Sequence, residues 1–190
     1  MIVHSTLERS RANGPGERFV LWVQGCARRC PGCYNPDTHA SPGTGRFMTP
    51  SEIADLMPEE GIDGVTVSGG EPFDQAAALA EFLAIARARG LHTLVYTGYR
   101  YAELAHGRDR QGRADWGDAL ELTDALVDGP FVKGLTPKAS WTGSGNQRYL
   151  VLERGQVIWE LGGRAEVSTL GEVIIAENGD VITTGILGCL

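Results

Sequence analysis

Residues 24–36 read QGCARRCPGCYNP and hold three cysteines in the spacing C-x-x-x-C-x-x-C, namely Cys26, Cys30 and Cys33. They follow a short apolar run at 18–23, which predicts a buried β-strand that ends at the first cysteine. Thiolates this close together can ligate one metal centre. In a 4Fe-4S cluster held by only three thiolates, one iron stays open to a small chelating ligand. The stretch therefore predicts a single cluster that does chemistry as well as electron transfer.

Other uses of the clustered thiols stay open at this point. A structural zinc site usually has four ligands, and the nearest histidine is His39. An electron-transfer ferredoxin needs a fourth cysteine nearby, whereas the remaining cysteine, Cys189, lies next to the C-terminus. We expect Cys189 to be a small buried side chain or part of a frayed end. A disulfide is disfavoured because an odd number of cysteines is clustered and nothing indicates export.

Charge and hydropathy exclude two classes of partner. The 190 residues carry 17 basic and 24 acidic side chains, a net charge of −7, and no basic cluster stands out beyond Arg28-Arg29. Binding to nucleic acid is therefore not expected. No apolar run approaches a membrane span and the N-terminal residues lack a signal pattern, so no membrane partner is expected either. We expect a cytoplasmic protein, because that compartment keeps thiols reduced.

Strand and helix patterns alternate along most of the chain. Strands are predicted at 18–23, 64–68, 91–97 and 125–127, with helices starting at Thr49 and ending near Pro58, over 75–89, and over about 116–124. Such alternation predicts an α/β fold with a parallel sheet and crossover helices. Candidate ligand groups follow each of these strands, which is the layout of a partial (β/α) barrel with its site at one mouth.

After about residue 149 the pattern changes to short strands and turns. Runs at 149–152, 157–159 and 173–175 predict strands, and Asn178-Gly179 predicts a hairpin turn. We therefore divide the chain into a barrel domain, residues 1–149, and a β-rich C-terminal extension, residues 150–190, that packs on it.

The cysteine spacing after a strand resembles the signature of radical S-adenosylmethionine (SAM) enzymes. Flanking motifs resemble the anaerobic ribonucleotide reductase activating enzymes, which are small glycyl-radical activases. The resemblance covers roughly residues 1–150, and Gly32 departs from the aromatic residue that often precedes the last cysteine. Its motifs are, in chain order, GPGER at 14–18, GC at 25–26, CPGCYNP at 30–36, VSGGEPF at 67–73, YTGY at 96–99, VDGPF at 127–131 and SGNQR at 144–148.

The resemblance implies a radical SAM barrel, one 4Fe-4S cluster on the three cysteines, and SAM as the second cofactor. The reduced cluster would cleave SAM to methionine and a 5′-deoxyadenosyl radical. SAM contacts would come from seven residues, with Glu71 and its neighbours at the amino group and Tyr34 at the adenine: Tyr34, Asn35, Ser68, Gly69, Gly70, Glu71 and Thr97. Simple packing is the alternative for Tyr34 and Thr97. Asp128 and Arg148 match family motifs, and a buried salt bridge or loop anchor is the simplest expectation for both.

Three functions remain open from the sequence, and no catalytic side chain is assigned. The first is an activase that removes a hydrogen atom from a backbone glycine of a partner such as anaerobic ribonucleotide reductase. It would take electrons from a flavodoxin or ferredoxin, because the chain has no second cysteine cluster. The second is a radical SAM enzyme that modifies another peptide or a small molecule, which the β-rich tail favours, as does TGSGN at 142–146, where the family pattern is Arg-Gly-Ser-Ser-Asn. The third is a non-catalytic metal-binding interaction module.

Overall fold

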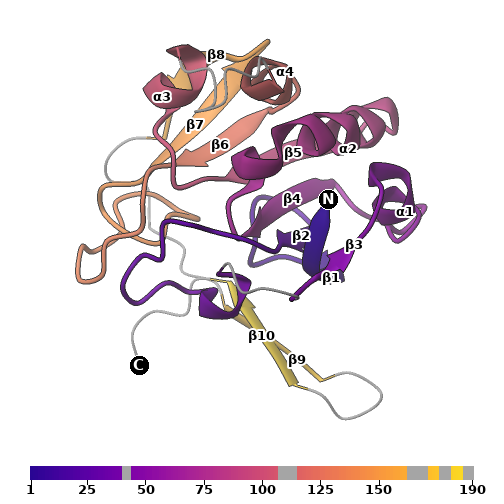
Figure 1. The fold of residues 1–190 in the computed structure, drawn as a ribbon, viewed down its shortest axis with the longest axis horizontal. Helices are drawn as coiled ribbons and strands as arrows, with labels where there is room; N and C mark the ends of the chain where they lie inside the picture. The colour runs from indigo at the N-terminus through magenta and orange to yellow at the C-terminus, as the bar shows by residue number, and fades with distance from the viewer. Residues whose placement is uncertain (40–43, 107–114, 162–170, 176–180, 186–190) are drawn as a thin grey trace.

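The computed structural model describes residues 1–39, 44–106, 115–161, 171–175 and 181–185. A large mixed sheet forms its body in the strand order β3-β1-β2-β4-β5-β6-β7-β8, and the helices lie along one side of it (Figure 1). The predicted α/β class is therefore confirmed. The strands of this sheet are β1 (Ile2–Ser10), β2 (Arg18–Val23), β3 (Arg46–Phe47), β4 (Gly64–Gly69), β5 (His92–Tyr96), β6 (Ala125–Asp128), β7 (Arg148–Glu153) and β8 (Gln156–Glu160).

The four strands predicted from apolar runs form the parallel centre of the sheet. Strand β2 pairs with β4, β4 with β5, and β5 with β6, all in parallel register. Parallel neighbours need crossover connections, and the helices lie on these crossovers. The helices are α1 (Pro50–Ala54), α2 (Ala76–Ala88), α3 (Tyr101–His106) and α4 (Asp115–Glu121), with 3₁₀ turns η1 (Pro36–Thr38) and η2 (Pro72–Gln75).

The start of α1 follows the predicted capping signal. The Thr49 hydroxyl accepts from the Glu52 amide at 3.3 Å, and the Glu52 carboxylate accepts from the Thr49 amide at 2.7 Å. This reciprocal pair satisfies two amides that would otherwise lack partners at the helix start. The helix ends at Ala54, four residues before the predicted limit at Pro58.

Antiparallel strands cover both edges of the parallel centre. Strand β1, which we did not predict, pairs with β2, and β3 pairs with β1. The sequence gives little sign of β1 because most of its side chains are polar and only Val3 and Ser10 are buried. On the other edge β7 pairs with β6 and β8 with β7.

The two faces of the sheet bury different side chains. The helix-covered face packs a continuous apolar core in which Leu21, Val67 and Leu126 from the sheet meet Leu79 and Phe82 of α2. The opposite face holds a smaller cluster around Leu94, Val127 and Tyr149, and it carries most of the buried polar groups of the strands. Among the described residues, no helix is both long and apolar enough to cross a lipid bilayer.

A buried arginine fills the amino-terminal end of the parallel strands. Arg18, 1% exposed, donates to Thr66 Oγ1 at 2.7 Å and to the carbonyls of Pro15 at 2.9 Å, Val65 at 2.5 Å and His92 at 2.9 Å. Burial lowers its pKa to about 10. These bonds hold the 14–18 motif against the ends of β4 and β5.

The predicted strands of the tail belong to two different sheets. Residues 149–152 and 157–159 lie in β7 and β8, so the predicted boundary at 149/150 falls inside a strand of the large sheet. Residues 173–175 lie in β9 (Gly171–Ile175), which pairs with β10 (Val181–Gly185) as a separate antiparallel hairpin. The predicted Asn178-Gly179 turn and Cys189 lie outside the described residues. The division into two domains stays a prediction.

Candidate functional site

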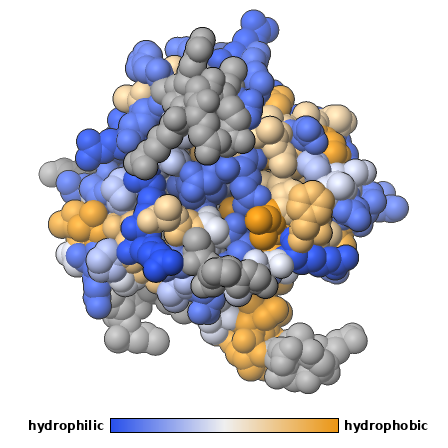
Figure 2. All heavy atoms as spheres, viewed as in Figure 1, coloured by the Kyte–Doolittle hydropathy of each residue, from blue (hydrophilic) through white to orange (hydrophobic). Residues whose placement is uncertain are grey.

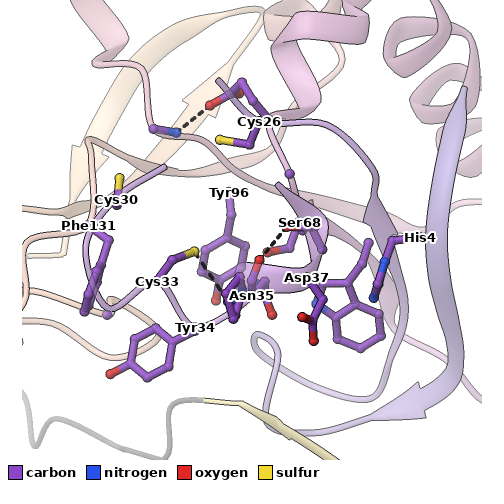
Figure 3. A pocket seen from close by; sticks show the side chains of 18 of the residues that line it. His4, Cys26, Cys30, Cys33, Tyr34, Asn35, Asp37, Ser68, Tyr96 and Phe131 are labelled. Carbon is purple, nitrogen blue, oxygen red and sulfur yellow. Dashed lines mark hydrogen bonds between the residues drawn. The ribbon is translucent and has the colours of Figure 1, made fainter. Parts of the chain in front are cut away.

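A cavity of about 460 Å³ opens at the carboxyl ends of the parallel strands (Figure 3). Strand β2 leads into residues 24–36, the cysteine loop, and β6 leads into residues 129–147, the β6–β7 loop. Because parallel strands end at the same edge of a sheet, these loops and the ends of β4 and β5 surround one space. All ten residues predicted to bind cofactors line this cavity: Cys26, Cys30, Cys33, Tyr34, Asn35, Ser68, Gly69, Gly70, Glu71 and Thr97.

The three cysteines lie around one end of the cavity as half-buried free thiols (Figure 3). A turn closed by the Cys33 amide and the Cys30 carbonyl, 3.1 Å apart, folds the loop. The Asn35 amide donates to Cys33 Sγ at 3.4 Å. Burial raises the pKa of the Cys26 and Cys33 thiols, and backbone hydrogen bonds to each sulfur oppose that rise.

The chemistry of this donor set suits an iron–sulfur cluster. The three free thiols line one cavity, and thiolate sulfur is the protein ligand of such clusters. Two buried nitrogens that line the cavity, Arg28 Nε and His39 Nε2, also have no hydrogen-bond partner among the described residues. These two nitrogens could form hydrogen bonds with a ligand bound beside the thiols.

Gly69 and Gly70 let the end of β4 approach the cysteine loop closely. The Gly70 amide donates to the Val23 carbonyl at 2.7 Å, and the Glu71 amide donates to the Gly25 carbonyl at 2.8 Å. A Cβ added at Gly70 would lie 2.2 Å from the Gly25 oxygen, and one at Gly69 would lie 2.6 Å from the Val23 nitrogen. Both glycines therefore have a packing reason to be glycine, and their predicted contact with SAM stays a prediction.

Glu71 is buried and bonded to protein at both carboxylate oxygens. One oxygen accepts from the Thr97 hydroxyl at 2.8 Å and the Phe73 amide at 3.1 Å, and the other accepts from the Gly98 amide at 2.8 Å. Burial raises its pKa to about 7, although these hydrogen bonds oppose the rise. Glu71 and Thr97 thus tie the ends of β4 and β5 together. Their side chains line the cavity while serving this structural role.

Arg28 joins the cysteine loop to these strand ends, and sequence reasoning missed it. Its Nε lies 3.8 Å from Glu71 Oε2, and its guanidinium carbon lies 4.0 Å from the centre of the Tyr99 ring. A Cβ on Gly98 would lie 2.4 Å from Arg28 Cδ, so glycine leaves the space that Arg28 occupies. The sequence did hold a sign of this contact, because a cationic residue in the cysteine loop and a glycine followed by tyrosine at 98–99 together could have indicated an arginine packed on an aromatic ring.

The β6–β7 loop packs against the cysteine loop through aromatic rings. Tyr34 meets Phe131 edge to face with ring centres 5.1 Å apart, and both rings line the cavity (Figure 3). At the base of the loop, Arg148 Nε donates to Asp128 Oδ1 at 3.0 Å, and its terminal nitrogen bonds the other oxygen. A buried salt bridge or loop anchor was expected for each residue, and the structure pairs the two with each other, with Asp128 buried and the Arg148 side chain 42% exposed.

Two walls of the cavity were not foreseen. His4 of β1 lines it and pairs through Nδ1 with Gln24 Oε1 at 2.8 Å. Residues 182–185 of β10 form another wall, anchored where Asn13 Nδ2 donates to Thr184 Oγ1 at 2.9 Å. Neither segment carries a motif, and only the pairing of β1 and the folding back of the hairpin bring them to the site.

Comparison with known proteins gives this geometry a family. Residues 12–150 match the family model described as a 4Fe-4S single cluster domain. The chain is 31% identical over 142 residues to the anaerobic ribonucleoside-triphosphate reductase-activating protein of Enterobacteria phage T4, covering 72% of this chain and 85% of that protein. It is 37% identical over 146 residues to the protein of the same name from Salmonella typhi, covering 71% and 88%.

A second kind of activating enzyme matches over a shorter region. The pyruvate formate-lyase-activating enzyme of Listeria monocytogenes is 41% identical over 99 residues, which is 49% of this chain and 40% of that enzyme. The cysteine loop and the ends of β4, β5 and β6 all fall within the residues that the family model matches. The chain therefore belongs to the 4Fe-4S single-cluster family and groups there with the anaerobic ribonucleoside-triphosphate reductase-activating proteins.

Proposed function

We propose that this protein is a radical SAM activase that installs a glycyl radical on a partner enzyme of the anaerobic ribonucleotide reductase type. The observation that carries the proposal is the meeting of three free thiols with the strand ends of a parallel sheet around one open cavity. The family membership supports the same reading. The radical SAM partial barrel is part of the proposal, supported by the four parallel strands and by the cavity at their carboxyl ends.

The chain's own residues divide into two groups around the proposed cofactors. Cys26, Cys30 and Cys33 would hold the cluster, and the cavity volume is within the usual range for a small-molecule ligand such as SAM. When bound, the reduced cluster and SAM supply the one-electron chemistry that removes a hydrogen atom from a backbone glycine. Tyr34, Asn35 and the 68–71 segment would position SAM and shield it from water.

The substrate would enter as a loop of a large polypeptide. The cavity opens at the carboxyl ends of the strands, and residues of the β6–β7 loop and of β10 line it there. Because the target is a backbone glycine, the cavity has to admit a narrow chain segment rather than a whole domain.

The proposal is tested with anaerobically reconstituted protein. We expect about four irons and four sulfides per chain, release of 5′-deoxyadenosine on reduction with SAM, and a glycyl radical signal in electron spin resonance when an anaerobic ribonucleotide reductase is added. Cys30→Ser should lose the cluster and all three signals. An intact cluster that cleaves no SAM, or a stoichiometric zinc in its place, would contradict the proposal.

One observation favours a second candidate function, modification of another peptide. The β9–β10 hairpin lies beyond the residues matched by the family model, yet it lines the cavity. Its outer face exposes Val173, Ile175 and Val181, each more than 60% exposed, and Figure 2 shows apolar atoms gathered there at the bottom of the view. SAM cleavage without a glycyl radical on a reductase, but with a product on a different peptide, would favour this candidate.

A further inference from the structure

We infer that the edge of β10 at residues 182–185 is a strand-pairing site for an extended segment of the substrate polypeptide. The segment would lie along β10 as an added strand of the β9–β10 hairpin, held there by backbone hydrogen bonds. This inference rests on the proposed function, because it takes the substrate to be a polypeptide that reacts at a backbone glycine.

The first observation is that β10 turns an edge, and not a face, toward the cavity. The consecutive residues Ile182, Thr183, Thr184 and Gly185 line the cavity, whereas no described residue of β9 lines it. Successive side chains of a strand point to opposite faces of its sheet, so a strand lying face-on would contribute alternate residues. An unbroken run of lining residues is expected when the strand lies edge-on to the cavity.

The second observation is that this edge carries backbone groups without a strand partner. The hairpin is separate from the large sheet (Figure 1), and within the described part of the chain β10 pairs with β9 alone. In an antiparallel pair, alternate residues direct both the amide and the carbonyl group away from the partner strand, so about half of these groups in β10 point away from β9. Such groups are a template for pairing with another chain.

The third observation is that side-chain contacts fix the hairpin in place. Asn13 Nδ2 donates to Thr184 Oγ1 at 2.9 Å. The Glu172 carboxylate accepts from the Ser10 hydroxyl and, at 2.8 Å, from the Arg11 amide. A two-stranded hairpin is marginally stable alone, so these contacts with the end of β1 and the residues after it position the edge before a substrate arrives. Pre-organisation of this kind lowers the entropic cost of binding.

The proposed substrate needs this kind of recognition. Glycine has no side chain that a pocket could hold, so the reacting Cα has to be positioned through the backbone on either side of it. The four lining residues of β10 span about 13 Å, enough to pair with a segment of similar length. Main-chain hydrogen bonding is how an extended peptide adds to an open sheet edge. Because the three cysteines line the same cavity, the paired segment would lie in the space that holds the proposed cofactors.

An added strand would also cover exposed apolar side chains. Val181 of β10 pairs with Ile175 of β9, and Val173 lies on the same face two residues earlier. All three side chains are exposed. Side chains of neighbouring strands pack together on one face of a sheet, so the added segment would place alternate side chains beside Val181. We therefore expect the segment to carry an apolar residue on that face.

The test is residue-resolved amide hydrogen exchange of the reconstituted holoenzyme, alone and with an anaerobic ribonucleotide reductase. In the free protein, the amides of β10 that bond to β9 should exchange more slowly than those that point to the cavity. Binding of the reductase should slow the cavity-side amides by about tenfold or more, which gives gains at alternate residues. Unchanged exchange in β10, or equal slowing of all its amides, would overturn the inference.

Proline variants measure the same pairing through activity. Neighbouring amides of β10 point to opposite edges, so one of Ile182→Pro and Thr183→Pro removes a cavity-side amide, and the exchange pattern identifies which. That variant should raise KM for the reductase by about tenfold, because it loses a backbone hydrogen bond to the segment. Alanine at the same position keeps the amide, so it should raise KM by about threefold at most. Equal effects of proline and alanine would show that the backbone edge is not the binding element.

Two further readouts separate this inference from the proposed function. Release of 5′-deoxyadenosine without reductase reports on the cofactor end of the cavity, and the glycyl radical signal reports on the reductase. If the holoenzyme cleaves no SAM, or forms no radical on the reductase, the proposed function fails. If the radical forms while exchange of the β10 amides stays unchanged, only the strand-pairing site is refuted.

Discussion

At the residue scale, the site depends on charged side chains that are buried or partly buried. Glu71 is 1% exposed, and its carboxylate accepts hydrogen bonds from two backbone amides and one hydroxyl. Arg28 provides the nearby positive charge at 3.8 Å. Burial outweighs these contacts and raises the pKa of Glu71 to about 7, so its charge changes within the physiological range.

This shift predicts a pH dependence of stability. The folded chain holds the Glu71 proton more tightly than the unfolded chain, whose carboxyl titrates near the ordinary value of 4.5, so this group's contribution falls as pH rises from below 4.5 to about 7 and then levels off. Relative to Glu71→Gln, the unaltered protein should lose about 1 kcal/mol of unfolding free energy between pH 6 and pH 8. Urea unfolding of both proteins at the two pH values measures this. A difference that stays constant with pH would contradict the raised pKa.

The Asp128–Arg148 pair makes a second residue-scale prediction. Arg148→Met leaves the Asp128 carboxylate buried without its cation, and the Tyr101 amide still donates to it at 2.8 Å. We expect a loss of about 2 kcal/mol in unfolding free energy, less than for a fully buried pair because the Arg148 side chain is 42% exposed. Thermal and urea unfolding measure the loss. Arg87→Met, which breaks the more exposed pair with Asp124, should cost about 0.5 kcal/mol. Equal losses would show that burial of Asp128 is not what matters.

At the element scale, the close approach of β4 to the cysteine loop predicts contrasting effects of alanine at two glycines. Gly70→Ala places a methyl group 2.2 Å from the Gly25 oxygen, so the strand and the loop have to separate. We expect it to destabilise the protein by at least about 2 kcal/mol and to lower cluster content after reconstitution. Gly117→Ala in α4 meets no atom within 4 Å and should stabilise the protein by about 0.5 kcal/mol, because alanine favours helix.

Unfolding and iron analysis of both variants decide this prediction. If Gly70→Ala keeps normal stability and normal iron content, the contact between β4 and the cysteine loop is not needed to shape the site.

The elements that sequence reasoning predicted are those whose apolar periodicity is strong. Strands such as 64–68 are buried on both faces, so they appear in the sequence as continuous apolar runs, and the Thr49 capping box marks a helix start locally. Strand β1 could not be foreseen because it lies near the edge of the sheet and keeps mostly polar side chains. The part of His4 in the cavity depended on that strand, so it was missed as well.

The candidate site was predictable in its motifs but not in its internal bonds. The order of motifs placed Cys26, Glu71 and Thr97 at strand ends, and parallel pairing then brought them to one cavity. That Glu71 bonds Thr97 and approaches Arg28 depends on side-chain packing across three loops, which no spacing rule contains. The β9–β10 wall depends on a long-range contact, in which Glu172 accepts from the Arg11 amide at 2.8 Å across 161 residues.

At the scale of the whole molecule, the loops around the thiols differ from the rest of the chain in charge, and the two sides of the sheet differ in what covers them. Acidic residues outnumber basic ones along the chain, yet the loops around the thiols are basic. The helices stabilise one side of the sheet, while loops and the hairpin shape the other side and its mouth (Figure 1). The site is therefore built on the parallel centre of the sheet, and loops and the hairpin border its opening.

Arg18 fills the amino-terminal end of the parallel strands, which bears on how ligands would exchange if the protein has the activity proposed above. The cavity lies at the carboxyl ends of the strands, so methionine and 5′-deoxyadenosine would leave on the same side of the sheet from which the polypeptide substrate would enter. We therefore expect the activated partner enzyme to dissociate before methionine and 5′-deoxyadenosine are exchanged for new SAM. Activation would then be non-processive, with one radical installed per binding event.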